Sequence, residues 1–156
     1  MNSRFQWHLR PSEGVTIAAL RGPVNEDADF SELVAHLRSA KHIRLELSGV
    51  EQINSCGVRE WVNFVRALPQ ASTLELEKCP PSVVSQLNII RNFAGSAQVL
   101  SVYAPYLCDA CGHELDVLVD VRDGEPPVLE EQTCEQCGAR MEFDDLEDSY
   151  FAFLSA

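Results

Sequence analysis

Two short cysteine repeats near the end of this 156-residue chain constrain its folding more than any other feature. Each repeat reads Cys-x-x-Cys-Gly-x-x-apolar, first from Cys108 to Leu115 and again from Cys134 to Met141. The 22 residues 112–133 separate the two cysteine pairs, slightly more than the roughly 15–20 usual for a four-cysteine metal site. We expect a hairpin in this interval, with strands at 114–121 and 128–133, to bring the two pairs together.

The spacing predicts one structural zinc ion held by four thiolates, those of Cys108, Cys111, Cys134 and Cys137. Four thiolates complete a tetrahedron around Zn²⁺ and leave no open position for water or substrate. Iron in a rubredoxin-like site is the strongest rival metal. A redox dithiol would need only one pair, and structural disulfides are rare in cytosolic chains. The segment resembles a zinc ribbon.

Charge divides the chain near the same place. Residues 1–102 hold ten Lys/Arg and ten Asp/Glu, whereas residues 103–156 hold two Lys/Arg against fourteen Asp/Glu and so carry the whole net charge of −12. This break predicts two modules, 1–102 and 103–156, joined by a short stiff segment at 103–107. An acidic second module argues against nucleic acid as a partner and favours a protein with a basic surface.

The acidic tail also carries aromatic residues. Phe143, Leu146, Tyr150 and Phe153 are spaced to line one helical face. We expect that face to pack on the rest of the chain, with a free partner-binding motif as the alternative.

In residues 1–102 the apolar pattern alternates between strand and helix periods. It predicts strands at 5–9, 15–20, 42–47, 73–77 and 99–102. Helices are expected over 26–39 with Asn25 as N-cap, from the Ser55 region through Val65, and from Pro80-Pro81 to near Gly95. Strands that alternate with helices indicate an α/β fold with an at least partly parallel sheet.

A polar cluster, Asn54-Ser55-Cys56-Gly57, lies where a strand hands over to a helix. Turns of this kind often carry function in α/β sheets. Ser55 is open to three interpretations, a helix cap, a catalytic nucleophile or a phosphorylation site. A catalytic nucleophile needs a base and an oxyanion site. The sequence contains neither a hydrolase motif nor a Gly-rich phosphate loop. It therefore does not favour an enzyme.

Three segments together resemble the STAS domain family, which includes the bacterial anti-sigma factor antagonists. Residues 47–58 (LSGVEQINSCGV) are similar to the signature in which Leu-Ser-x-Val precedes apolar-Asp-Ser-Ser/Ala-Gly-Leu. Residues 20–25 (LRGPVN) resemble the family's Leu-x-Gly-x-Leu-Asp, and residues 81–87 (PSVVSQL) resemble its Ser-Pro-x-Val-x-x-x-Leu. The resemblance covers nearly all of residues 1–102 in the right order.

The resemblance implies a phosphorylation switch at Ser55. In anti-sigma factor antagonists the matching serine is phosphorylated by an anti-sigma factor that is also a kinase, and the phosphate weakens the complex. A helix N-terminus can accommodate the added charge of about −1.5 to −2 without unfolding.

The chain departs from the family pattern at two positions. Asn54 replaces the Asp, which removes a carboxylate beside the acceptor hydroxyl. Cys56 occupies the second small position, where a buried filler or a thiol with a redox role would both fit.

The sequence therefore predicts an α/β fold, a STAS-like mixed β-sheet packed with helices followed by a small β-rich zinc ribbon. We expect a non-enzymatic cytosolic regulator without a membrane span. Its partner, an anti-sigma factor or serine kinase, would bind a surface formed by Asn25, Asn54, Ser55, Cys56, Gly57 and Arg59. Two alternatives are a constitutive STAS adaptor, as in ABC-type transport complexes, and a redox or zinc sensor that uses Cys56 and the four-cysteine site.

Overall fold

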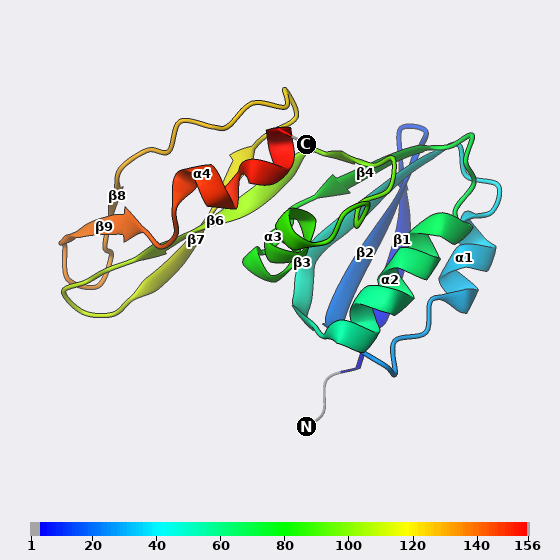
Figure 1. Cartoon of the computed structure of the whole chain (residues 1–156), viewed down its shortest axis with the longest axis horizontal. Helices are drawn as coiled ribbons and strands as arrows, with labels where there is room; N and C mark the ends of the chain where they lie inside the picture. Colours follow the sequence, from blue (N-terminus) through cyan, green and yellow to red (C-terminus); the bar gives the residue numbers. More distant parts are fainter. Residues whose placement is uncertain (1–3, 156) are drawn as a thin grey trace.

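The computed structural model describes residues 4–155 and contains two β-sheets that lie end to end (Figure 1). The first sheet has the order β1-β2-β3-β4-β5. Its strands are β1 (Gln6–Ser12), β2 (Val15–Val24), β3 (His42–Ile53), β4 (Thr73–Glu77) and β5 (Gln98–Val99). β1 runs antiparallel to β2, and β2 to β5 pair in parallel, so this sheet is mixed.

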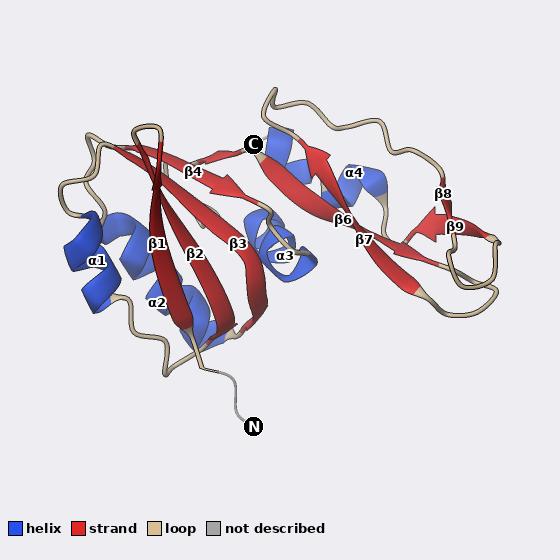
Figure 2. Cartoon of the chain, turned by 180° about the vertical axis from the view of Figure 1, so that it is seen from behind, coloured by secondary structure: helices blue, strands red, loops and turns tan. Residues whose placement is uncertain are grey.

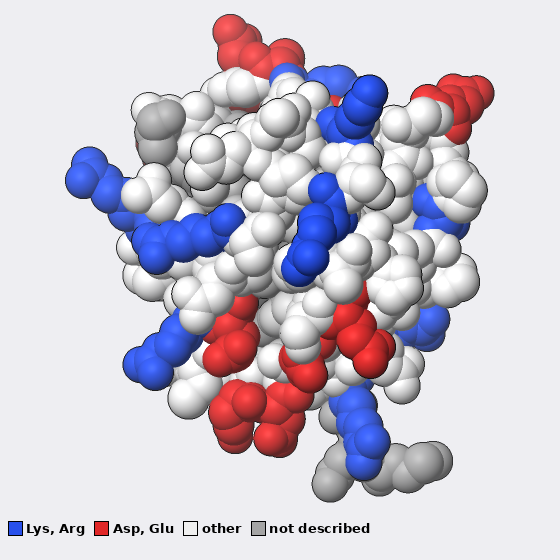
Figure 3. All heavy atoms as spheres, turned by 90° about the vertical axis from the view of Figure 1, so that its right-hand side faces the viewer, with Lys and Arg blue, Asp and Glu red and all other residues white. Residues whose placement is uncertain are grey.

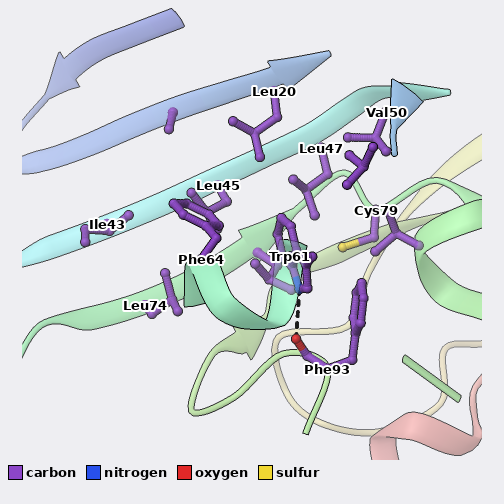
Figure 4. Close-up of a cluster of buried hydrophobic side chains, with 14 of the residues drawn as sticks. Leu20, Ile43, Leu45, Leu47, Val50, Trp61, Phe64, Leu74, Cys79 and Phe93 are labelled. Atoms are coloured by element: carbon purple, nitrogen blue, oxygen red, sulfur yellow. Dashed lines mark hydrogen bonds between the residues drawn. The ribbon is translucent and has the colours of Figure 1, made fainter. Parts of the chain in front are cut away.

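Helices α1 (Ser31–Leu37) and α2 (Ser55–Ala67) cover one face of the first sheet, and Figure 2 shows the strands in front of them. The alternation in β3 explains why, because Ile43, Leu45 and Leu47 are fully buried while the residues between them are half-buried. Trp61 of α2 lies at the centre of this core (Figure 4), and its Nε1–H donates to the Phe93 carbonyl at 2.8 Å.

Helix α3 (Pro81–Ile89) lies beside β3, between the first sheet and the second (Figure 1). Pro81 at its first turn fits the predicted start, because proline lacks the N–H that a helix leaves unpaired there. Val83 and Val84 are buried toward the sheet, whereas Ile89 at the other end is 71% exposed.

The second sheet is antiparallel and curled, with the order β7-β6-β9-β8. Its strands are β6 (Ser101–Leu107), β7 (Glu114–Asp120), β8 (Gln132–Thr133) and β9 (Arg140–Phe143). The predicted fold class, a mixed α/β unit followed by a small β-rich unit, is thus confirmed. None of the helices within residues 4–155 is long and apolar enough to cross a bilayer.

The expected hairpin between 114–121 and 128–133 is wrong. β7 pairs with β6, and β8 pairs with β9. Pro126 and Pro127 lack backbone N–H donors, so the segment before β8 cannot form a strand ladder. It runs instead as an extended connection that ends in the two-residue β8.

The stiff joint predicted at 103–107 is also wrong, because these residues belong to strand β6. At its start β6 is tied to the first unit: the Cys79 N–H donates to the Ser101 carbonyl at 3.1 Å, and the Tyr103 N–H donates to the Cys79 carbonyl at 2.8 Å. Residue 102 therefore lies inside a strand, and the division into modules 1–102 and 103–156 stays a proposal.

The helix predicted over 26–39 is shorter, and Asn25 does not cap it. α1 begins at Ser31, and Asn25 Oδ1 instead accepts the Asp27 N–H at 2.9 Å. Asp29 Oδ1 accepts the Ser31 N–H, also at 2.9 Å. Such local side-chain acceptors compete with helical hydrogen bonds and favour turns. The apolar spacing was still informative, because Phe30 and Leu33 are buried.

The C-terminal residues pack against α3. They form α4 (Glu147–Tyr150) and a 3₁₀ turn (Ala152–Ser155). Tyr150 is buried in the same core as the first sheet, and Phe143 and Phe153 pack against that core half-buried, as the sequence predicted for an aromatic face. Phe151, which was not on the predicted face, is buried there as well. Leu146 was expected on that face and is 72% exposed, because the helix starts only after it.

Asn88 of α3 connects the two units through both ends of its amide. Its Nδ2 donates to the Tyr150 carbonyl at 2.9 Å, and its Oδ1 accepts the Phe153 N–H at 2.8 Å. Tyr150 is further held through its hydroxyl, which donates to the Tyr103 carbonyl.

We predict that Asn88→Ala lowers the free energy of unfolding by about 1–2 kcal/mol, since two hydrogen bonds are lost. Urea unfolding would measure this, and the Phe153 amide should exchange faster with deuterated solvent. Ser85→Ala, at an exposed position of the same helix, is the matched control. Equal exchange at Phe153 in both variants would contradict the role given to Asn88.

Candidate partner-binding surface and metal centre

The residues predicted to bind a partner come together where β2 and β3 end and α2 begins. The Asn54 N–H donates to the Val24 carbonyl at 3.2 Å, which joins the end of β3 to the end of β2. Gly57 lies against the same carbonyl, so closely that a Cβ on Gly57 would stand 1.8 Å from the Val24 oxygen. Only glycine allows the first turn of α2 this approach to β2.

Asn54 caps α2, a role that was one of the three interpretations of Ser55. Its Oδ1 accepts the Gly57 N–H at 2.8 Å, and the helix starts at Ser55. An amide oxygen at the N-cap satisfies one of the free N–H groups of the first turn. The Ser55 side chain is exposed and is not needed for the cap.

Glu26 is a member of this site that the sequence analysis missed. The Asn54 Nδ2 donates to Glu26 Oε2 at 3.0 Å, so the side chain of Asn54 joins α2 to the loop after β2. Hydrogen bonds from its own backbone N–H and from the Asn54 amide hold the pKa of the Glu26 carboxyl below its usual range. A full negative charge therefore lies beside the residue that precedes Ser55.

The remaining predicted residues are placed as follows. Cys56 and Arg59 are exposed on the first turns of α2, so Cys56 is not the buried filler that was one interpretation. Asn25 is half-buried in the same loop as Glu26.

The first unit carries both signs of charge, and Figure 3 shows Lys/Arg and Asp/Glu on one of its faces.

The four cysteines of the second unit converge, although the pairing of the strands around them differs from the prediction. Cys108 follows β6 and Cys134 follows β8, and the two knuckle loops lie at the end of the second unit farthest from the first sheet (Figure 1). All four Sγ atoms lie within 4.8 Å of one another. The sulfur atoms of Cys108 and Cys137 are 3.5 Å apart, and those of Cys111 and Cys134 are 3.6 Å apart.

These distances fit a tetrahedral metal ion. Bonds of about 2.3 Å to the metal place the sulfurs of a regular tetrahedron about 3.8 Å apart. The two knuckles repeat the same backbone bonds: the Gly112 N–H donates to the Cys108 carbonyl at 2.7 Å, and the Gly138 N–H to the Cys134 carbonyl at 2.8 Å. The second, independent copy of the turn shows that both loops are shaped to present thiols to one point.

Backbone N–H groups also point at the sulfurs. The N–H of Cys111 is the main reason why the pKa of the Cys108 thiol falls to about 7. Hydrogen bonding to the charged form favours the thiolate at Cys108, the form that binds a metal. The pKa values of the Cys111 and Cys137 thiols are raised instead, through hydrogen bonds with the neighbouring sulfurs. The four cysteines are close enough together to bind a metal ion.

Comparisons with known proteins find a likeness among solved structures. No family model matches the chain, and no curated protein matches it. Among solved structures it is similar to an anti-sigma factor antagonist from Mycobacterium paratuberculosis, at 16% sequence identity and a TM-score of 0.49. That match covers 62% of this chain and 85% of the other.

We predict that Gly57→Ala lowers the free energy of unfolding by about 1–3 kcal/mol, because the new methyl group forces α2 away from β2. Cys56→Ala, one residue earlier and exposed, should change it little. Chemical denaturation of both variants tests this. A Gly57→Ala protein as stable as the Cys56→Ala protein would mean that α2 does not lie this close to Val24.

We predict that the chain binds one Co²⁺ ion per molecule with the intense visible absorption of a tetrahedral thiolate site. Cys108→Ser and Cys134→Ser should abolish the spectrum, whereas Cys56→Ser should keep it. Metal content should fall as the pH is lowered, because protons compete for the thiolates. An unchanged spectrum in Cys108→Ser would exclude this ligand set.

Proposed function

We propose that this chain is a non-enzymatic STAS-type regulator of the cytosol that binds an anti-sigma factor or related serine kinase. The partner surface is formed by Asn25, Asn54, Ser55, Cys56, Gly57 and Arg59, and Ser55 is the phosphate acceptor. The observation that carries the proposal is the free, exposed position of Ser55 at the start of α2, with Asn54 acting as the cap.

Glu26 supplies the carboxylate that is missing before Ser55 because Asn54 stands in place of the family's aspartate. The family motif has a carboxylate directly before the serine, and this chain has an amide there. The Glu26 carboxylate, hydrogen-bonded to that amide at 3.0 Å, supplies a negative charge at nearly the same place. A kinase that reads an acid beside the acceptor hydroxyl would find it in Glu26.

Phosphorylation of Ser55 would act on the interface and not on the fold. The hydroxyl is exposed, so a phosphate of about −1.5 to −2 charges can be added without moving the core. The phosphate would lie near the Glu26 charge. It would repel an acidic partner surface and would overlap sterically with a closely packed one. The dipole of the 13-residue α2 partly offsets this repulsion within the free protein.

We propose that the metal in the second unit is one structural zinc ion. Its ligands would be the thiolates of Cys108, Cys111, Cys134 and Cys137. Four protein ligands leave no open coordination position, so the ion stabilises the loops and does not take part in a reaction. The alternative of a redox or zinc sensor predicts that an oxidant or a chelator changes partner binding while the first unit stays folded.

We predict that the wild-type chain and Ser55→Ala capture an ATP-binding kinase or anti-sigma factor from the native cell lysate, and that Ser55→Asp loses it at least about tenfold. The physical reason is the added charge at the centre of the interface. Quantitative mass spectrometry of the captured proteins measures the loss. Ser39→Asp, at an exposed serine that follows α1, controls for charge alone.

Equal capture by wild type, Ser55→Ala and Ser55→Asp would leave a constitutive adaptor as the function. The variant Glu26→Gln provides a second test, in which the rate of Ser55 phosphorylation by the purified kinase is measured. It should slow phosphorylation of Ser55 while the circular dichroism of the protein stays unchanged. Equal rates for wild type and Glu26→Gln would remove Glu26 from recognition.

A further inference from the structure

A cleft separates helix α3 from the C-terminal helix α4, away from the surface around Ser55. It has a volume of about 420 Å³ and takes its lining from both units. Its lining includes Pro81 and Ile89 of α3, Pro105 of β6, and Asp144 and Asp145 of the segment before α4. We call these residues the α3–α4 cleft, and the two aspartates its acidic rim.

The cleft is held open by contacts described above. Asn88, which lines it, fixes α3 to the backbone of Tyr150 and Phe153. The Asp144 N–H donates to the Pro105 carbonyl at 2.8 Å, so the acidic rim is attached to β6. Because its walls are already in place, a ligand would not have to order them first.

The charged residues that line the cleft are all acidic, and they lie beside exposed apolar residues. Ile89 is 71% exposed, which is unusual for a large apolar residue at the mouth of a cleft, and Leu146 beside Asp145 is 72% exposed. Among the described residues neither Asp144 nor Asp145 takes part in an ion pair, and no Lys or Arg lines the cleft. Residues 103–156, with fourteen Asp/Glu against two Lys/Arg, add a strong negative field around it.

We propose that the α3–α4 cleft is a second docking site, for a protein segment that carries Lys or Arg next to an apolar side chain. The apolar side chain packs on Ile89 and the prolines, and the cation lies at the Asp144–Asp145 rim. Charge complementarity selects this occupant, because an acidic segment would be repelled and an apolar one would leave both carboxylates unpaired. The site does not depend on Ser55 or on its phosphorylation.

The test uses the full, metal-loaded chain labelled with ¹⁵N and a synthetic amphipathic peptide of leucine and lysine. A peptide with glutamate in place of every lysine is the matched control. We expect the lysine peptide to shift the amide signals of Ile89, Asp144, Asp145 and Ser149, and the glutamate peptide to shift none of them. Binding should weaken as salt is raised, since the rim carboxylates are exposed.

Two variants and two controls separate this cleft from general attraction to an acidic protein. Ile89→Asp and the double variant Asp144→Asn/Asp145→Asn should each raise the Kd of the lysine peptide at least about fivefold. Val128→Asp changes another exposed apolar residue, 92% exposed, and Asp123→Asn/Glu125→Gln removes two charges in the loop after β7. Neither control should raise the Kd by more than about twofold.

The proposal is overturned if all four variants bind alike, or if the shifts map to Val128 and Leu118. It is also overturned if the chain dimerises without peptide and Ile89→Asp abolishes the dimer, because the occupant would then be a second copy. The six substituted positions are exposed, so folding of the four variants can be checked by their unchanged Co²⁺ spectra and melting temperatures.

Discussion

Strand β6 is the constraint on which the arrangement of the molecule depends. At its start it exchanges backbone hydrogen bonds with Cys79 of the first unit, and along its whole length it pairs with β7 of the second. A β-strand cannot bend freely between two ladders, so the second sheet must leave the first in a fixed direction. The C-terminal aromatic residues then fold back over α3, and Tyr150 and Phe151 complete a core that began with β2 and β3.

The second unit has a sheet with only a small apolar core of its own. Away from the first unit its buried core consists of five residues, Ala104, Tyr106, Cys108, Cys134 and Met141. Two of these five, Cys108 and Cys134, are cysteines of the knuckles, so the thiol cluster is part of this small core. A sheet of this size rarely folds without a staple such as a bound metal. One end of the second unit therefore packs around the four cysteines, and the other end packs on the core of the first unit.

The features of the fold and site that could be predicted are those determined by residues close together in the sequence. The α/β alternation, the start of α3 at Pro81 and the convergence of the four cysteines followed from residue types and spacing. The wrong hairpin had a local warning in Pro126-Pro127, whereas the pairing of β7 with β6 is a contact that no short pattern specifies. Asn25 failed as a cap because Asp27 and Asp29 lie in a series of local turns, an outcome set by competing side-chain acceptors.

Glu26 could not be found from spacing at all, because it is 28 positions from Asn54 in sequence and meets it only through the ends of two parallel strands. This contact couples the residues at the two positions. An aspartate at position 54 would set two carboxylates about 3 Å apart, so its negative charge is favoured only beside a neutral residue at position 26. In either combination, Asn54 with Glu26 or an aspartate with a neutral residue, one carboxylate lies beside the first turn of α2, and only the residue that carries it differs.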